Sequence, residues 1–190
     1  MRVLNLIRLI KKYFPKLYWS IRPLSKMNAY KKSDPNFSEF LIQTTNKYFG
    51  SENFETIIDF GCAFGIKTEP LFKSIDAKNF TGVETNVWVR LFGKNTEIRK
   101  FASLAAILKK VKNENILFIA NASLMYLSEK EKKKLFLELP KSTCIIITEP
   151  NTKFYESVSI ESDITIIDQF KISKYVYNPG IDAICFVARK

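Results

Sequence analysis

A carboxylate followed by a loop of small residues is the part of this sequence best suited to binding a ligand. Asp59 lies near the end of an apolar, β-branched run at residues 56–60, which predicts a buried strand. Small side chains dominate the loop after it: Gly61, Cys62, Ala63 and Gly65. Because such residues leave the backbone accessible, a ligand can approach the main chain closely. The pattern predicts a cofactor loop at the carboxyl end of a strand, where open α/β sheets bind ligands.

A second carboxylate indicates which part of a cofactor would bind. Glu84 ends the next predicted strand, residues 79–84, and follows Asp59 by twenty-five residues. An acidic side chain at this spacing is suited to accept hydrogen bonds from the two ribose hydroxyls of a nucleoside. The dinucleotide fingerprint G-x-G-x-x-G/A is not met, because its second and third positions are Ala63 and Ile66. The sequence therefore favours a nucleoside cofactor held by a different motif.

The pattern Asp-x-Gly-x-Ala-x-Gly at residues 59–65 resembles the first motif of the class I S-adenosylmethionine-dependent methyltransferases. That motif is usually Asp/Glu-x-Gly-x-Gly-x-Gly, so Ala63 stands in place of the middle glycine. The likeness in the order of elements covers residues 36–190. It implies an α/β fold with a doubly wound, Rossmann-like, mostly parallel sheet, helices on both faces and a C-terminal antiparallel hairpin. It also implies S-adenosyl-L-methionine as the cofactor and methyl transfer as the reaction.

The resemblance gives individual residues expected roles. Asp59 is expected near the methionine ammonium and Glu84 on the ribose, with Thr85 beside it. Ser103 is the candidate for the adenine amine, because the family's usual acidic residue is missing there. Asn121 is expected to face the methionine end or the methyl acceptor, or else to cap the following turn. The predicted cofactor-binding residues are Asp59, Gly61, Cys62, Ala63, Gly65, Glu84, Thr85, Ser103 and Asn121.

Catalysis needs few dedicated groups in this chemistry. Methyl transfer from a sulfonium is an in-line displacement that alignment can drive, with effective molarities of about 10⁵ to 10⁸ M. The chain has no histidine, and its three cysteines lack the paired spacing of a zinc site, so no metal site is predicted. Tyr126 and Glu149 follow the fourth and fifth strands and are the candidates to orient or deprotonate an acceptor hydroxyl. Alternatively, Tyr126 is a buried wall and Glu149 a surface residue.

Alternating strands and helices must position these residues. Strands are predicted at residues 55–60, 79–84, 97–101, 115–121 and 143–149, with helices at 37–49, from 66, from 87, at 102–112 and at 128–139. This alternation indicates a parallel sheet with right-handed crossovers. Runs 171–177 and 183–188 flank Asn178-Pro179-Gly180 and predict the terminal hairpin, whereas the strand-like run 164–167 has no evident partner.

The positive charge is concentrated at the amino terminus. The chain has a net charge of +11, and residues 1–33 carry nine Lys and Arg and no Asp or Glu, against twenty-one and nineteen in the rest. We therefore predict a basic extension, residues 1–35, before the methyltransferase domain, residues 36–190. At helical spacing, apolar residues of 1–14 share one face and basic residues the other, and Pro15 is expected to end this helix.

That amphipathic pattern has three interpretations. It fits an interfacial helix on an anionic membrane surface, contacted through residues 1–14. Its apolar face could instead pack on the domain or on a partner subunit, or the segment with Tyr18, Trp19, Ile21 and Arg22 could contact RNA. No signal-type or membrane-spanning apolar run occurs. The prediction is a cytoplasmic protein, with contact at the inner membrane face as an extension of it.

The absence of certain motifs narrows the class of methyl acceptor. Residues 121–124 lack the Asn/Asp-Pro-Pro-aromatic motif used on planar amide or adenine nitrogens, and the chain has no inserted recognition domain. These features favour a small molecule, a sugar or a lipid-linked glycan as acceptor. An RNA methyltransferase and a catalytically inactive methyltransferase-like binding protein remain alternatives. The sequence predicts no oligomeric state.

Overall fold

The structure is a computed structural model that describes residues 9–10, 13–22, 35–93, 97–111, 115–149, 163–172 and 183–190. Its strands are β1 (Thr56–Phe60), β2 (Asn79–Val83), β3 (Arg99–Phe101), β4 (Ile116–Asn121), β5 (Cys144–Glu149), β6 (Thr165–Ile172) and β7 (Ala183–Arg189). Its helices are α2 (Pro15–Ile21), α3 (Pro35–Phe49), α4 (Glu69–Ser74), α5 (Val87–Phe92), α6 (Leu104–Leu108), the 3-10 turn η3 (Leu124–Tyr126) and α7 (Glu129–Glu138).

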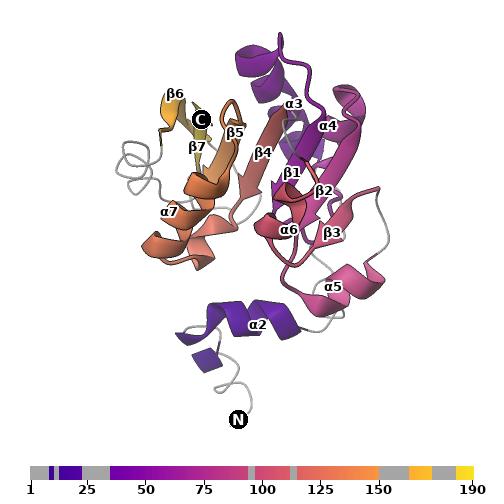
Figure 1. The fold of residues 1–190 in the computed structure, drawn as a ribbon, viewed down its shortest axis with the longest axis vertical. Coiled ribbons are helices and arrows are strands. Elements are labelled where there is room, and N and C mark those ends of the chain that lie inside the picture. The colour runs from indigo at the N-terminus through magenta and orange to yellow at the C-terminus, as the bar shows by residue number, and fades with distance from the viewer. Residues whose placement is uncertain are drawn as a thin grey trace.

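One seven-stranded sheet organises the molecule, with strand order β3-β2-β1-β4-β5-β7-β6 (Figure 1). The strands from β3 to β5 in this order are parallel, whereas β7 pairs antiparallel with both β5 and β6. The order reverses direction at β1 and β4, which is the switch point where open α/β sheets form their ligand crevice. The predicted doubly wound, mostly parallel sheet with a C-terminal antiparallel hairpin is confirmed.

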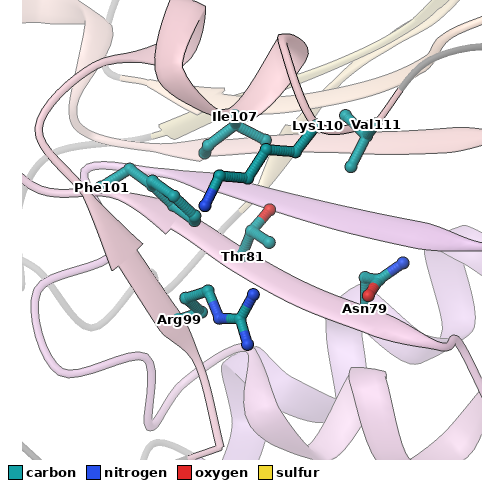
Figure 2. Close-up of a pocket in the computed structure, with 7 residues that line it drawn as sticks. All are labelled: Asn79, Thr81, Arg99, Phe101, Ile107, Lys110 and Val111. Carbon is teal, nitrogen blue, oxygen red and sulfur yellow. The ribbon is translucent and has the colours of Figure 1, made fainter.

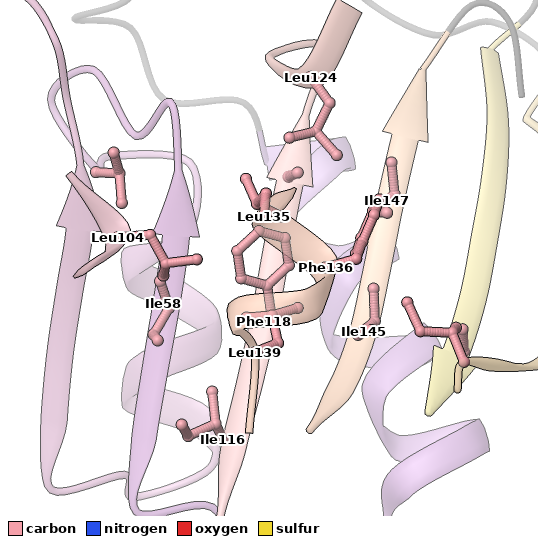
Figure 3. Packing of buried hydrophobic residues seen from close by; sticks show 14 of the residues in the cluster. Ile58, Leu104, Ile116, Phe118, Leu124, Leu135, Phe136, Leu139, Ile145 and Ile147 are labelled. Carbon is pink, nitrogen blue, oxygen red and sulfur yellow. The ribbon is translucent and has the colours of Figure 1, made fainter. Parts of the chain in front are cut away.

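The central strands are buried on both faces, as their continuous apolar runs predict. Ile58, Phe118 and Ile145 point to one face, where they pack against α6 and α7, as Figure 3 shows for this cluster. Ile57 and Leu117 point to the other face, where they pack in a cluster with residues of α3 and α4. Because helices cover both faces, only the ends of the strands remain available for a site.

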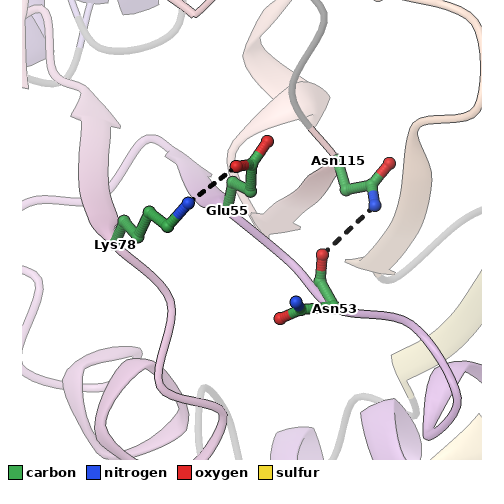
Figure 4. A network of polar contacts seen from close by, with 4 residues as sticks. All are labelled: Asn53, Glu55, Lys78 and Asn115. Atoms are coloured by element: carbon green, nitrogen blue, oxygen red, sulfur yellow. Dashed lines mark hydrogen bonds and ion pairs between the residues drawn. The ribbon is translucent and has the colours of Figure 1, made fainter.

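Polar contacts join the strands at the amino ends (Figure 4). Lys78 Nζ lies 2.9 Å from Glu55 Oε1, and the Asn115 side-chain amide donates to the Asn53 carbonyl at 3.2 Å. These residues immediately precede β2, β1 and β4. The amino ends of the strands are thus closed by structural contacts, and the predicted site residues lie at the opposite end.

Most predicted elements lie within two residues of the observed ones, but three differ. The helix predicted from residue 66 begins at Glu69, because residues 66–68 form turns, and the helix predicted at 102–112 is only Leu104–Leu108. The described partner of β7 is Thr165–Ile172, which contains most of the run 164–167 and the first two residues of the predicted run 171–177; residues 173–177 lie outside the described residues. Leu9, Ile10 and Tyr13 are helical and Phe14 is not, which agrees with the predicted helix end at Pro15; the proline also begins α2, as a proline at the first helical position can. Asn178-Pro179-Gly180 lies outside the described residues.

Candidate functional site

The loop after β1 has the backbone conformation that its small residues permit. Gly61, Ala63 and Gly65 all have positive φ angles, of 76°, 47° and 78°. The Gly61 and Cys62 amides donate to the Val83 carbonyl at 2.8 and 3.2 Å, which ties the loop to the end of β2. Left-handed backbone costs a non-glycine residue roughly 1–2 kcal/mol. Ala63 therefore occupies a position where a glycine would be less strained, in agreement with the glycine that the family motif has there.

Glycine is required at position 61 for packing. A Cβ added at Gly61 would lie 2.4 Å from the Cβ of Ser123, which follows β4 and donates its hydroxyl to the Phe60 carbonyl at 2.6 Å. A Gly61→Val substitution would therefore disturb the contact between the loops after β1 and β4 before it reached any bound ligand. Loss of binding in that variant would not by itself locate the methionine end of a cofactor.

Glu84 holds the loop after β1 against the start of α5. It is 7 % exposed, and its Oε2 accepts from the Ala63 amide at 2.8 Å while its Oε1 accepts from the Asn86 amide at 2.7 Å. Burial raises the pKa of the Glu84 carboxyl, and the two amide donors oppose this shift. A carboxylate oxygen accepts more than one hydrogen bond, so both oxygens retain the capacity to accept from a ligand hydroxyl.

Asp59 is the second buried carboxyl at this end of the sheet. It is 4 % exposed and accepts a hydrogen bond from the Thr68 hydroxyl. Burial raises the pKa of Asp59 to about 7; the Thr68 hydrogen bond opposes this shift, and the negative charge of Glu84 adds to it. Two coupled carboxyls beside a small-residue loop create a site with a preference for cationic or hydroxyl-bearing groups.

The other predicted cofactor residues have different surroundings. Cys62 is buried and lies against Gly82, where an added Cβ would be 2.4 Å from its sulfur. Burial raises the pKa of the Cys62 thiol well above its ordinary value, so this residue lines the loop as an uncharged group. Thr85 and Ser103 are exposed, after β2 and β3, respectively. Asn121, at the end of β4, accepts from the Thr148 hydroxyl at 2.8 Å.

Tyr126 and Glu149 are brought together by η3. Glu149 is 1 % exposed, which excludes the surface location considered from the sequence, and its Oε1 accepts from the Met125 amide at 2.9 Å. This bond fixes the turn that carries Tyr126. Burial raises the pKa of the Tyr126 phenol above its ordinary value. The neutral phenol is therefore favoured near pH 7, which suits orientation of an acceptor better than removal of its proton.

Asn86 is a site residue that the sequence reasoning missed. Its side-chain oxygen accepts from the Val89 amide at 3.1 Å and caps α5. Its side-chain nitrogen donates to the carbonyls of Trp19 and Arg22 at 2.7 and 2.9 Å. The cap has a local signal, an asparagine just before a predicted helix. The bonds to residues more than sixty positions earlier have none.

These bonds place residues 13–22, which include α2 and are called the α2 segment below, across the carboxyl ends of the strands, as Figure 1 shows. Trp19 lies near Asn86, which follows β2, and its ring lies 5.5 Å from that of Tyr126, which follows β4. The Arg22 guanidinium lies 4.9 Å from the centre of the Trp19 ring, and its Nε is buried without a hydrogen-bond partner among the described residues. The segment thus contributes aromatic and cationic groups to the same end of the sheet.

A separate cavity lies at the β3 edge of the sheet (Figure 2). It has a volume of about 230 Å³ and is lined by residues of β2, β3 and α6 and by two residues that follow α6: Asn79, Thr81, Arg99, Phe101, Ile107, Lys110 and Val111. None of the predicted cofactor residues lines it. The candidate site therefore lies at the carboxyl end of the sheet, between the loops after β1, β2, β4 and β5 and the α2 segment. We call this region the mouth of the sheet.

Comparison with solved structures identifies the fold. The chain is similar to a S-adenosylmethionine-dependent methyltransferase from Clostridium acetobutylicum, with 13 % identity, a TM-score of 0.62 and coverage of 100 % of this chain and 99 % of that one. The N-methyltransferase NodS of Bradyrhizobium japonicum is 13 % identical, with a TM-score of 0.60 over 83 % and 98 % of the two chains. The tRNA methyltransferase TrmK of B. subtilis is 16 % identical, with a TM-score of 0.53 over 78 % and 64 %.

Sequence comparison adds no assignment, since no family model and no curated protein matches the chain. The solved structures that share the fold include one named as a tRNA methyltransferase and one named only as an N-methyltransferase, so the fold leaves the acceptor undetermined. The strand order, the conformation of the loop after β1 and the similarity to solved structures all indicate the same fold. The chain has the fold of the class I S-adenosylmethionine-dependent methyltransferases.

Proposed function

We propose that the protein is a S-adenosylmethionine-dependent methyltransferase whose acceptor is a small molecule, a sugar or a lipid-linked glycan. The observation that carries this proposal is the contact between Glu84 and the Ala63 amide. It unites the acidic residue after β2 with the small-residue loop after β1, at the switch point of the sheet. This combination supplies a ribose acceptor next to backbone that a cofactor can approach.

The residues at the mouth fit the chemical groups of this cofactor. Its ribose hydroxyls would bind Glu84 and its ammonium would lie near Asp59, both buried acidic groups. The buried Nε of Arg22, which has no partner among the described residues, offers a donor for a carboxylate. Bound S-adenosylmethionine would supply an electrophilic methyl group. The role of this chain is then to hold and align the two reactants.

The acceptor would lie beside the contact between the loop after β4 and the α2 segment. Tyr126 and Trp19 present aromatic surface there, and the Met125–Glu149 bond holds the turn that carries Tyr126. In this proposal Tyr126 orients an acceptor hydroxyl with its neutral phenol, and Glu149 is a positioning residue. The buried environment would exclude water from the reacting methyl group.

The acceptor class is tested by methyl labelling. Purified protein is incubated with S-adenosylmethionine labelled in the methyl group and with separate lipid, small-molecule and RNA fractions from cells. We expect label in the lipid or small-molecule fraction, and its loss with Glu84→Ala. Label confined to RNA would refute the proposed acceptor class and support the RNA alternative.

A further inference from the structure

Large exposed apolar side chains are concentrated at one end of the molecule. In the described part of the chain, seven of the ten belong to residues 9–17 or to α5: Leu9, Tyr13, Phe14, Leu17, Trp88, Leu91 and Phe92. Trp88 and Phe92 are one turn apart, and their rings stack with centroids 6.1 Å apart. Single exposed apolar residues are ordinary, but a cluster of them marks an interaction surface. We call these seven residues the apolar face.

The apolar face borders the mouth of the sheet. The α2 segment packs against α5, and Asn86, immediately before α5, binds the backbone of that segment at Trp19 and Arg22. Figure 1 shows α2 and α5 beside each other, beyond the end of the sheet. The inner side of the segment therefore contacts the domain while Tyr13 and Leu17, 61 % and 53 % exposed, face solvent. The sequence presented packing on the domain and contact with an external partner as alternatives for this segment. In the structure, the segment can do both at once through opposite sides.

The sequence around the first four residues of the apolar face is strongly basic, which favours one class of partner. Residues 1–33 carry nine basic and no acidic residues, whereas the rest of the chain is nearly balanced. Apolar and aromatic side chains next to basic ones match the boundary between headgroups and acyl chains in an anionic lipid layer. RNA would satisfy the positive charge but would leave most of the aliphatic side chains in water. None of the helices in the described part of the chain has the length and apolar character needed to cross a bilayer.

We propose that the α2 segment and α5 together form a surface that binds an anionic membrane. The sequence predicted membrane contact for residues 1–14 alone. The proposed surface adds α5, a helix of the domain that gave no such signal in the sequence. Because the apolar face borders the mouth, such binding would present the site to molecules in the headgroup layer. That consequence rests on the proposed function, whereas the binding itself does not.

The proposal is tested with the full chain and two matched pairs of substitutions. The first is Leu91→Ser with Phe92→Ser, on the apolar face. The control is Leu137→Ser with Ile167→Ser, which are similarly exposed on α7 and β6. In sedimentation with vesicles of phosphatidylcholine and phosphatidylglycerol, we expect the first pair to weaken binding about tenfold or more and the control pair to bind as the wild type does. Added salt should weaken wild-type binding.

Several results would overturn the proposal. These are a wild-type protein that ignores the vesicles, equal losses in both variants, or equal binding to phosphatidylcholine alone. A dimer dissociated by the first pair but not by the control would assign the apolar face to a second copy of the chain. Circular dichroism checks that both variants fold. Vesicle binding by a wild-type protein that does not bind S-adenosylhomocysteine would refute the proposed function and leave the membrane surface standing.

Discussion

Glu84→Ala is expected to weaken S-adenosylmethionine binding at least tenfold. The carboxylate would lose charge-assisted hydrogen bonds to the ribose, which contribute about 1.5–3 kcal/mol each. The structure also predicts a cost to the free energy of unfolding. Removal of the side chain leaves the Ala63 and Asn86 amides without their acceptor, and an unsatisfied buried donor costs about 1–3 kcal/mol.

Two measurements separate these effects. Calorimetry gives the affinity and urea unfolding gives the stability of each variant. Glu84→Gln is the matched control, because it keeps the size of the side chain and one acceptor oxygen, so it should lose less stability than alanine. An alanine variant that folds and binds with wild-type affinity would remove Glu84 from the site.

Asp59 is expected to make the free energy of unfolding depend strongly on pH. Burial raises the pKa of Asp59 to about 7, from an ordinary value of 3.8. The folded protein then binds this proton more tightly than the unfolded chain does, so the contribution of Asp59 is fully present below about pH 4 and is lost as the pH rises through 7. A shift of about three units corresponds to a loss on the order of 4 kcal/mol.

Asp59→Asn removes this titration while keeping an oxygen for the Thr68 hydroxyl. We expect its free energy of unfolding to depend less on pH between 4 and 7 than that of the wild type, and to exceed the wild-type value at pH 8. Urea unfolding at a series of pH values measures both quantities. Identical pH profiles for the two proteins would show that Asp59 has no raised pKa. Glu84, Lys100 and Cys62 surround Asp59 electrostatically and are unchanged in the variant.

Local patterns explain why so much of the fold could be predicted. The strands β4 and β5 are short, continuous runs of apolar residues, and each observed strand begins one residue after the predicted start. The helix α7 begins with a capping box between Ser128 and Glu131, a signal contained in four residues. The loop after β1 was predicted because small residues leave a direct trace in the sequence. In all these cases the determining contacts are close along the chain.

The features that could not be predicted from the sequence depend on contacts between residues far apart in the chain. Asn86 binds the backbone at Trp19 and Arg22, and no local pattern predicts which segment its side chain reaches. The run 164–167 had no evident partner in the sequence, and its pairing with β7 as part of Thr165–Ile172 is a contact between distant residues. The burial of Glu149 likewise follows from its bond to the Met125 amide across two strand ends. Tertiary packing decides such cases because several local conformations have similar energies.

Titration calorimetry with S-adenosylhomocysteine measures cofactor binding itself, because this demethylated product has the ribose and adenine of the cofactor and cannot transfer a methyl group. We expect one binding site per chain with micromolar or tighter affinity, weakened at least tenfold by Glu84→Ala, and no heat of binding with NAD. Absence of binding to S-adenosylhomocysteine by the folded wild-type protein, or binding of NAD in its place, would contradict the claim that this fold holds a methyl-donor cofactor.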